Sequence, residues 1–348
     1  MTGDPKRVAR FGIDFHKTPF AFREFAFDSL VFPACSNCNE RFGKLEEVIK
    51  PIFVRLLAYL PLSSEELILL LDWLDKVRVG LWLGYLYLDK NPLGIDPMFH
   101  IESRIGLFDR MVSILRMEDA GIGLTFTGPE FKGYHLSPTC FGLGVNGLGL
   151  VNASGIDLCS QRLGFPFMQP LRIREDHKLE ASYEAGSERI MNPVERRAAL
   201  PRSSALYQPI FQSFNRLEGG EKFVASDWVR ERSADVRIGY GKLFQQKPDS
   251  VQIYPDEKSS DWIPLGTWKK WEVMTRLPEY AYNRIRGDYE RGISLASSKE
   301  DRKHMRKQGQ MTKRLDQAML RKANDAVGRV EGVGASVRRR DRRRSSAP

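Results

Sequence analysis

Two cysteines three positions apart, in the run Cys35-Ser36-Asn37-Cys38, constrain the fold of this chain more than any other feature. A short apolar stretch, Leu30 to Phe32, precedes them, and a helical pattern of apolar residues follows from Phe42 to Ile49. Two thiolates at this spacing can share one zinc ion, which would join a strand to a helix. The sequence therefore predicts a structural zinc site held partly by Cys35 and Cys38. The alternative is a pair of buried, reduced thiols that pack as small apolar groups.

The residues around this pair also resemble a known family. The run from Val31 to Glu46, in which Asn39 directly follows the second cysteine, is similar to the second half of the motif of the HNH endonucleases. The resemblance covers roughly residues 10–50. It implies a ββα-metal fold in which Asn39 contacts a catalytic metal ion, Mg²⁺ or Mn²⁺, while the two cysteines hold zinc. His16 lies 19 residues before Cys35, the place of the family's general base.

The resemblance predicts an HNH-type metal-dependent endonuclease. Residues 1–34 contain no cysteine, so the family's first CxxC is absent, and we expect a truncated or degenerate form of the site. In an active form His16 would deprotonate a water molecule, and the metal ion at Asn39 would stabilise charge on the phosphate. Other interpretations remain, because His16 lies among aromatic residues and Asn39 is a good helix cap. The competing function is a non-catalytic nucleic-acid-binding or interaction protein with a structural zinc knuckle.

The net charge of +10 is confined to one end of the chain. Of the 54 Lys and Arg and the 44 Asp and Glu residues, 18 and 8 respectively follow Arg284, and the remaining 36 of each sign balance. Residues 297–324 can form a basic helix, and an arginine block comes after it: Arg338, Arg339, Arg340, Arg342, Arg343 and Arg344. Such an arm suits the phosphates of a nucleic acid, with DNA favoured, because each neutralised phosphate releases counterions. The alternatives are a solvated tail, or an arm for an acidic protein or an anionic lipid.

Length and composition predict an α+β protein with three parts. A chain of 348 residues with 42% apolar residues can bury a large core. We expect an HNH-like segment over residues 1–50, an α+β body over 51–284, and a basic helical arm over 285–348 that ends in a disordered, arginine-rich tail. Four cysteines and the lack of an apolar leader after Met1 favour the cytoplasm. Charged residues interrupt the long apolar run at 67–88, so no membrane partner is expected.

One helix of the body has a clear start. Ser63 and Glu66 form a capping box, which predicts a helix that ends near Asp89. Within this helix Asp75 and Arg78 are three positions apart, so we expect them to pair on its solvent-facing side.

The rest of the body gives weaker signals. Apolar spacing predicts a second helix over residues 103–117, in which Arg104, Asp109 and Arg110 are expected in solvent or in structural ion pairs. Gly and Pro then divide the chain into antiparallel strands expected over residues 122–126, 131–136 and 141–150. Gly142 to Gly147 match a dinucleotide-binding pattern, but no helix follows, so no such site is expected. Short helices and long loops are expected over residues 168–265. The cluster of Trp262, Trp268 and Trp271 should close the core, and the alternative is that it docks a partner.

Overall fold

The structure is a computed structural model that describes most of the chain. The described residues are 8–14, 21–26, 35–88, 101, 105–118, 120–129, 131, 133–134, 137–165, 167–168, 172–173, 179–180, 183–184, 187–190, 204–211, 227–235, 239–295 and 298–345. His16, Arg104 and the apolar stretch from Leu30 to Phe32 lie outside these residues.

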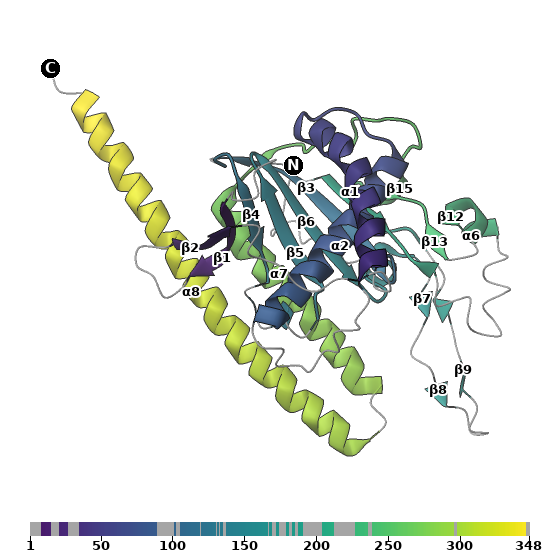
Figure 1. Ribbon diagram of the computed structural model, residues 1–348. Helices are drawn as coiled ribbons and strands as arrows, with labels where there is room; N and C mark the ends of the chain where they lie inside the picture. The colour runs from purple at the N-terminus through teal and green to yellow at the C-terminus, as the bar shows by residue number, and fades with distance from the viewer. Residues whose placement is uncertain are drawn as a thin grey trace.

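In the described part of the chain, ten strands form one mainly antiparallel sheet (Figure 1). The strand order is β15-β14-β11-β3-β6-β5-β4-β1-β2, and β16 pairs with β3. The strands are β1 (Val8–Asp14), β2 (Ala21–Ala26), β3 (Asp109–Glu118), β4 (Leu124–Thr127), β5 (Cys140–Val145), β6 (Leu148–Gly155), β11 (Ser204–Gln208), β14 (Phe244–Gln246), β15 (Val251–Ile253) and β16 (Thr267–Lys269). The β1–β4 and β3–β16 pairs are parallel. The sheet and its helices confirm the expected α+β class.

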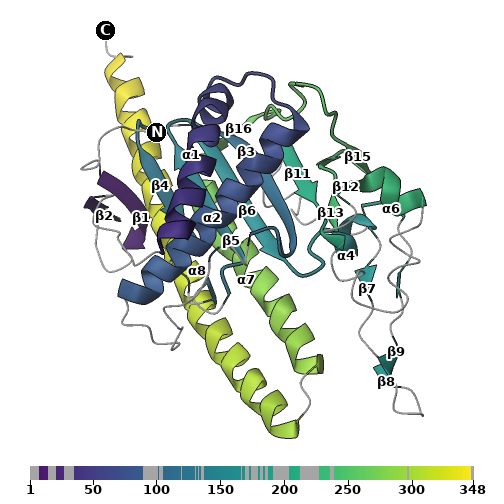
Figure 2. The ribbon, with the colours of Figure 1, turned by 45° about the vertical axis from the view of Figure 1, so that its right-hand side comes forward.

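Helices cover both faces of this sheet. On one face lie α1 (Ser36–Leu57) and α2 (Ser64–Leu88), and on the other lie α7 (Lys270–Leu295) and α8 (Lys299–Ser345), as Figures 1 and 2 show. Each face therefore has its own apolar core, one packed against α2 and one against α7. Trp262 is fully buried in the core on the α2 side, as the sequence predicts, whereas Trp268 and Trp271 are half-buried.

The central strand β3 corrects the helix expected over residues 103–117. Val112 and Ile114 point toward the core on the α2 side, while Met111 and Leu115 belong to the core on the α7 side. A strand that is buried on both faces carries a continuous apolar run, and such a run also satisfies helical spacing. The expected helix is wrong because periodicity alone does not separate these two cases.

The segment expected as one strand over residues 141–150 is a hairpin of β5 and β6. Its turn lies at Asn146 and Gly147, where Asn146 has a left-handed backbone with φ 53°. A glycine also allows a close helix contact within β5, because a Cβ at Gly142 would lie 2.6 Å from a side-chain methyl group of Leu277 in α7, which would have to shift. The glycines that match a dinucleotide pattern thus serve a turn and a close helix contact. Of the segment 131–136, the described residues Gly133 and Tyr134 are helical, so the strand expected there is not formed at them.

The start of α2 follows the capping box. The Ser63 hydroxyl accepts from the Glu66 N–H at 3.3 Å, and the Glu66 carboxylate accepts from the Ser63 N–H at 2.9 Å. Arg55 of α1 donates to the same carboxylate, which ties the two helices together. Asp75 and Arg78 do pair, at 2.8 Å, but both are buried against the sheet instead of facing solvent.

The remaining described elements are short. Three two-stranded sheets pair β7 (Phe167–Met168) with β10 (Tyr183–Glu184), β8 (Arg172–Ile173) with β9 (Leu179–Glu180), and β12 (Ser233–Asp235) with β13 (Tyr240–Gly241). The helices α4 (Ser160–Leu163) and α6 (Asp227–Arg232) lie near them in the sequence. Over residues 168–265 the described residues are therefore richer in short strands than the sequence predicts. None of the described helices is both long and apolar enough to cross a membrane.

Candidate functional site

Helix α1 begins directly at the cysteine pair. Cys35 is its N-cap residue, with an extended backbone, and the Cys35 Sγ accepts a hydrogen bond from the Cys38 N–H at 3.3 Å. Cys35 is exposed, whereas Cys38 is buried. The hydrogen bond between the two side chains lowers the pKa of the Cys35 thiol and raises the pKa of the Cys38 thiol. Cys35 is therefore the thiol of this pair that ionises first.

The cysteine pair would supply two of the ligands of the expected zinc site. Asn39 follows in the same turn, where its N–H donates to the Cys35 carbonyl oxygen at 3.0 Å and its side chain is exposed. A structural zinc ion takes four ligands. Among the described residues, no group of three or more His, Cys, Asp or Glu side chains is placed to hold one ion. The structure thus brings Cys35, Cys38 and Asn39 together, and the zinc site stays a prediction.

The order of elements around this pair is strand, strand, helix. β1 and β2 form an antiparallel hairpin ahead of α1, and β1 also pairs with β4, so the hairpin extends one edge of the main sheet. Helix α1 instead packs on α2, where the rings of Phe53 and Trp73 meet edge to face. His16 falls between β1 and β2, outside the described residues, so its position relative to Asn39 stays a prediction.

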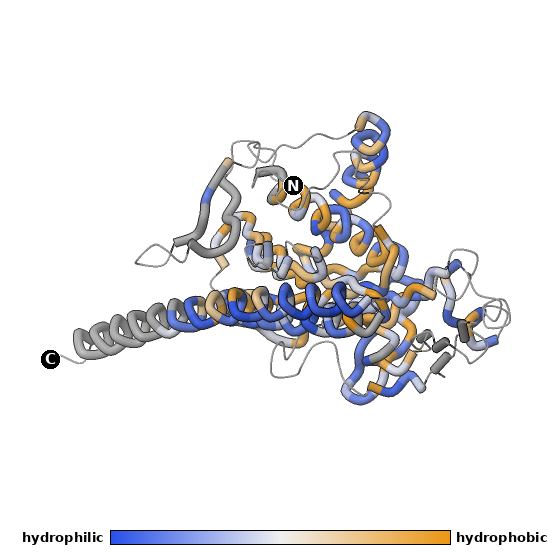
Figure 3. Tube along the Cα trace, turned by 90° about the horizontal axis from the view of Figure 1, so that it is seen from below, coloured by the Kyte–Doolittle hydropathy of each residue, from blue (hydrophilic) through white to orange (hydrophobic). Residues whose placement is uncertain are grey.

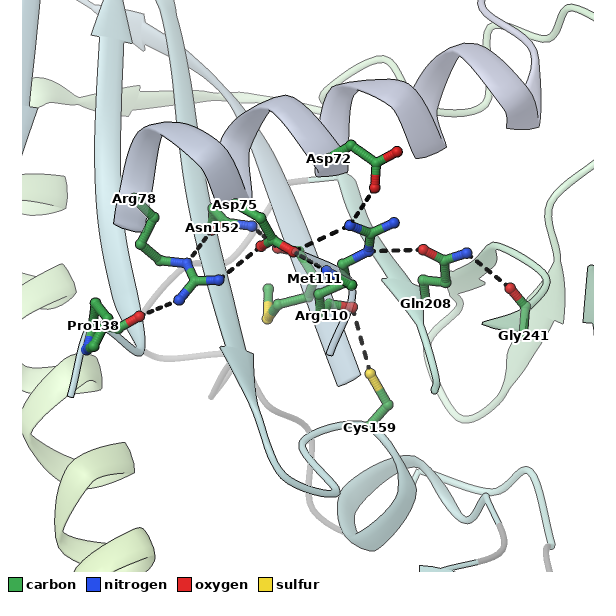
Figure 4. A network of polar contacts seen from close by, with 11 residues as sticks. Asp72, Asp75, Arg78, Arg110, Met111, Pro138, Asn152, Cys159, Gln208 and Gly241 are labelled. Atoms are coloured by element: carbon green, nitrogen blue, oxygen red, sulfur yellow. Dashed lines mark hydrogen bonds and ion pairs between the residues drawn. The ribbon is translucent and has the colours of Figure 1, made fainter. Parts of the chain in front are cut away.

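A buried polar network joins α2 to the sheet (Figure 4). Arg110 of β3 is fully buried and donates through Nη1 to Asp72 at 2.6 Å and to Asp75 at 3.1 Å. Asp75 also accepts from Arg78 at 2.8 Å, and Arg78 donates through Nε to Asn152 of β6 at 2.8 Å. Burial would lower the pKa of Arg110, but the two carboxylates outweigh it and raise that pKa. Arg110 therefore stays charged and has the structural ion pairs expected from the sequence.

Asp109 forms a second buried site on the opposite face of the sheet. Its Oδ2 accepts from the N–H groups of Cys159 and Ser160 at 2.9 and 3.1 Å, and its Oδ1 accepts from the Ile210 N–H at 2.7 Å. Burial raises the pKa of Asp109, which these donors counteract, and burial also raises the pKa of Cys159. Backbone N–H groups donate to both oxygens of the Asp109 carboxylate, and these bonds fix the start of α4 to β3. No sequence pattern indicated this role, because its partners are 50 to 101 residues away.

One side of helix α8 displays a row of cations. It has 47 residues, a length of about 70 Å at ~1.5 Å per residue, and it extends past the body (Figure 1). We call the exposed residues Lys303, Lys307, Arg314 and Arg321 the basic stripe. Their spacings of four, seven and seven positions place them on one side of the helix.

The other side of α8 packs on the body. Thr312, Asp316 and Ala323 are buried there, and Figure 3 shows α8 as a long, mainly hydrophilic helix that runs along the body. These residues are turned by about half a revolution from the basic stripe, at ~100° per residue. The arginine block at 338–344 lies within the same helix, which continues to Ser345. The backbone of this block is thus helical, where the sequence suggested a disordered tail.

Comparisons with protein-family models, with curated proteins and with solved structures found no match to this chain. Its function must therefore be argued from its own residues.

Proposed function

We propose that this protein binds nucleic acid, with DNA favoured, through the basic stripe of α8. The observation that carries the proposal is the spacing of Lys303, Lys307, Arg314 and Arg321, which sets four exposed cations in a row opposite the packed side of the helix. A row of cations fixed on a long helix suits a polyanion whose charges repeat at short intervals. The balanced charge of residues 1–284 supports the same conclusion, because it leaves the helical arm as the basic region.

The salt dependence of DNA binding tests this proposal. In a stripe-neutral variant the four cations of the basic stripe are replaced together by Gln, and binding to a fluorescein-labelled duplex is followed by anisotropy over a range of salt. Each lost phosphate contact should flatten the slope of log K against log salt by about 0.9, so four contacts amount to about 3.6. The stripe-neutral variant should also bind the duplex more weakly than the unaltered protein at low salt.

A matched control separates position from net charge. The control variant removes four exposed cations from the rest of the protein by substitution with Gln, at Lys44, Lys50, Arg230 and Lys269. It has the same net charge as the stripe-neutral variant, but its slope should stay close to that of the unaltered protein. Equal slopes in the two variants would show that overall charge, and not the basic stripe, determines binding. An unaltered protein with no measurable affinity for duplex or single strands would overturn the proposal.

The second candidate function is HNH-type cleavage of nucleic acid. What favours it is the position of Asn39, whose exposed side chain lies in the first turn of α1 beside the cysteine pair. In this proposal Asn39 contacts a divalent cation, Mg²⁺ or Mn²⁺, which supplies stabilisation of the negative charge on the phosphate. His16 accepts the proton of the attacking water, and Cys35 and Cys38 hold the local fold through zinc.

Plasmid nicking tests this second candidate. Cleavage should require added Mg²⁺ or Mn²⁺ and should be lost in both His16→Ala and Asn39→Ala. Asn37→Ala is the control, since Asn37 is also exposed at the start of α1 but does not occupy the position given by the family resemblance. Cleavage that persists in His16→Ala would assign the activity to other residues or to a contaminant.

A further inference from the structure

A cleft of about 200 Å³ lies between α7 and α8. Two tyrosines of α7, Tyr282 and Tyr289, line it, seven positions apart and therefore on one side of their helix. Gly309 of α8 faces Tyr289, and a Cβ at Gly309 would lie 3.6 Å from the Tyr289 ring. The Tyr289 side chain is half-buried and lines the cleft, so part of its ring remains accessible from there. Burial raises the pKa of both tyrosines, so their rings stay neutral.

The same cleft contains an excess of cations. Arg306 and Lys313 reach it from α8, again seven positions apart, and both are exposed. Neither has a carboxylate partner among the described residues. Arg286 of α7 also lines the cleft and pairs with Glu290 at 3.5 Å. Three cations against one carboxylate, next to two aromatic rings, form a site for a ligand that is both flat and anionic.

We propose that the cleft between α7 and α8 binds one unpaired nucleotide of a single-stranded nucleic acid. The base would stack on Tyr289, with Tyr282 closing the inner wall, and its phosphate would contact Arg306 and Lys313. Aromatic stacking beside a basic groove is how proteins hold single strands without reading their sequence. The inference rests on the proposed function and deepens it, because Arg306 and Lys313 lie beside the basic stripe on the same helix and a strand could pass from one to the other.

The test compares neighbouring residues on α8. Lys313 lines the cleft, whereas Arg314 belongs to the basic stripe, and both are exposed. Binding of a labelled single-stranded oligonucleotide and of the corresponding duplex is measured by anisotropy for Lys313→Gln and Arg314→Gln. Lys313→Gln should weaken binding of the single strand more than binding of the duplex. Arg314→Gln should weaken both to the same degree.

The stacking ring is tested by two substitutions of Tyr289. Tyr289→Ala removes the ring and should weaken single-strand binding about fivefold or more, whereas Tyr289→Phe keeps the ring and should stay within about twofold of the unaltered protein. Thermal melting of both variants checks that α7 and α8 remain packed, and Lys313→Gln and Arg314→Gln change only exposed side chains, so they should leave that packing intact.

The outcomes separate this inference from the function on which it rests. If Tyr289→Ala binds the single strand as well as Tyr289→Phe does, or if Lys313→Gln and Arg314→Gln behave alike, the cleft proposal is wrong while the basic stripe can still stand. If the unaltered protein binds neither single strand nor duplex, both proposals fail. If AMP binds more tightly than the oligonucleotide, and does so through Tyr289, the cleft belongs to a free nucleotide and the strand proposal is overturned.

Discussion

Asp75 holds two buried arginines at once, and Asp75→Asn is the substitution that the network makes most costly. The Asp75 carboxylate accepts from Arg78 at 2.8 Å, from Arg110 at 3.1 Å and from the Gly106 N–H at 3.2 Å, with a side chain only 1% exposed. Asn at this position has nearly the same size, so the main change is the loss of one negative charge between two buried cations.

The loss of stability in Asp75→Asn depends on which partners the two arginines keep. Arg78 would have no carboxylate partner in the described network, and Arg110 would keep only Asp72. Leaving a buried ion unpaired costs roughly 3–5 kcal/mol, and the one oxygen that Asn retains places the expected loss near the lower end. Since typical stabilities of folded domains are about 5–15 kcal/mol, the loss should be a large share of the total.

Asp72→Asn is the matched control. Asp72 pairs with the same guanidinium of Arg110 at 2.6 Å, but its side chain is 29% exposed and Arg110 keeps Asp75 when it is changed. Its loss should therefore cost about 1 kcal/mol or less. Both variants are unfolded in urea and followed by tryptophan fluorescence, and the midpoint of Asp75→Asn should be far lower. Equal midpoints would refute the view that burial of the shared carboxylate holds α2 on the sheet.

Two further predictions concern the first two helices. Iodoacetamide should alkylate Cys35 first in the native protein, as measured by peptide mass mapping, because its thiol is exposed and has a lowered pKa; earlier reaction of Cys140 or Cys159, both buried, would contradict this structure. Burial alone would raise the pKa of Glu66, but hydrogen bonds from Arg55 and Ser63 lower it to about 2 from 4.5. A depressed folded-state pKa stabilises the protein above pH 4.5, and this contribution is lost as the pH falls toward 2. Glu66→Gln should therefore melt at a lower temperature than the unaltered protein at pH 6, and the difference should vanish near pH 2; a difference that is constant with pH would refute the assignment.

The sequence predicts best where the signal is local. The capping box of Ser63 and Glu66 gives the start of α2 within one residue, because both partners lie within one turn. The same reasoning fails for β3, since Met111, Ile114 and Leu115 fit a helical stripe as well as a strand buried on both faces. This segment is a strand because it pairs with β6 and β11, and both of these come from distant parts of the chain.

For the candidate sites too, the sequence predicts local features but not contacts between distant residues. The place of Cys35 at the start of a helix could be read from the sequence, because a CxxC and the helical pattern after it are both local signals. The burial of Arg110 could not, since its partners Asp75 and Gln208 are 35 and 98 residues away. Nor could the α7–α8 cleft, which depends on how two helices pack side by side. Net charge indicated a basic arm, but only packing shows which of its cations face outward.

That packing fixes the direction in which the basic stripe points. A tail that serves only solubility needs charge but no particular spacing, and it has no reason to bury one of its sides. In α8 the buried residues Thr312, Asp316 and Ala323 fix the rotation of the helix about its axis. Because that rotation is fixed, Arg314 always points away from the body and Lys313 always points toward the cleft. The two cations are neighbours in sequence but have different surroundings, so a difference between Lys313→Gln and Arg314→Gln would be direct evidence that the helix presents its charges in a defined orientation.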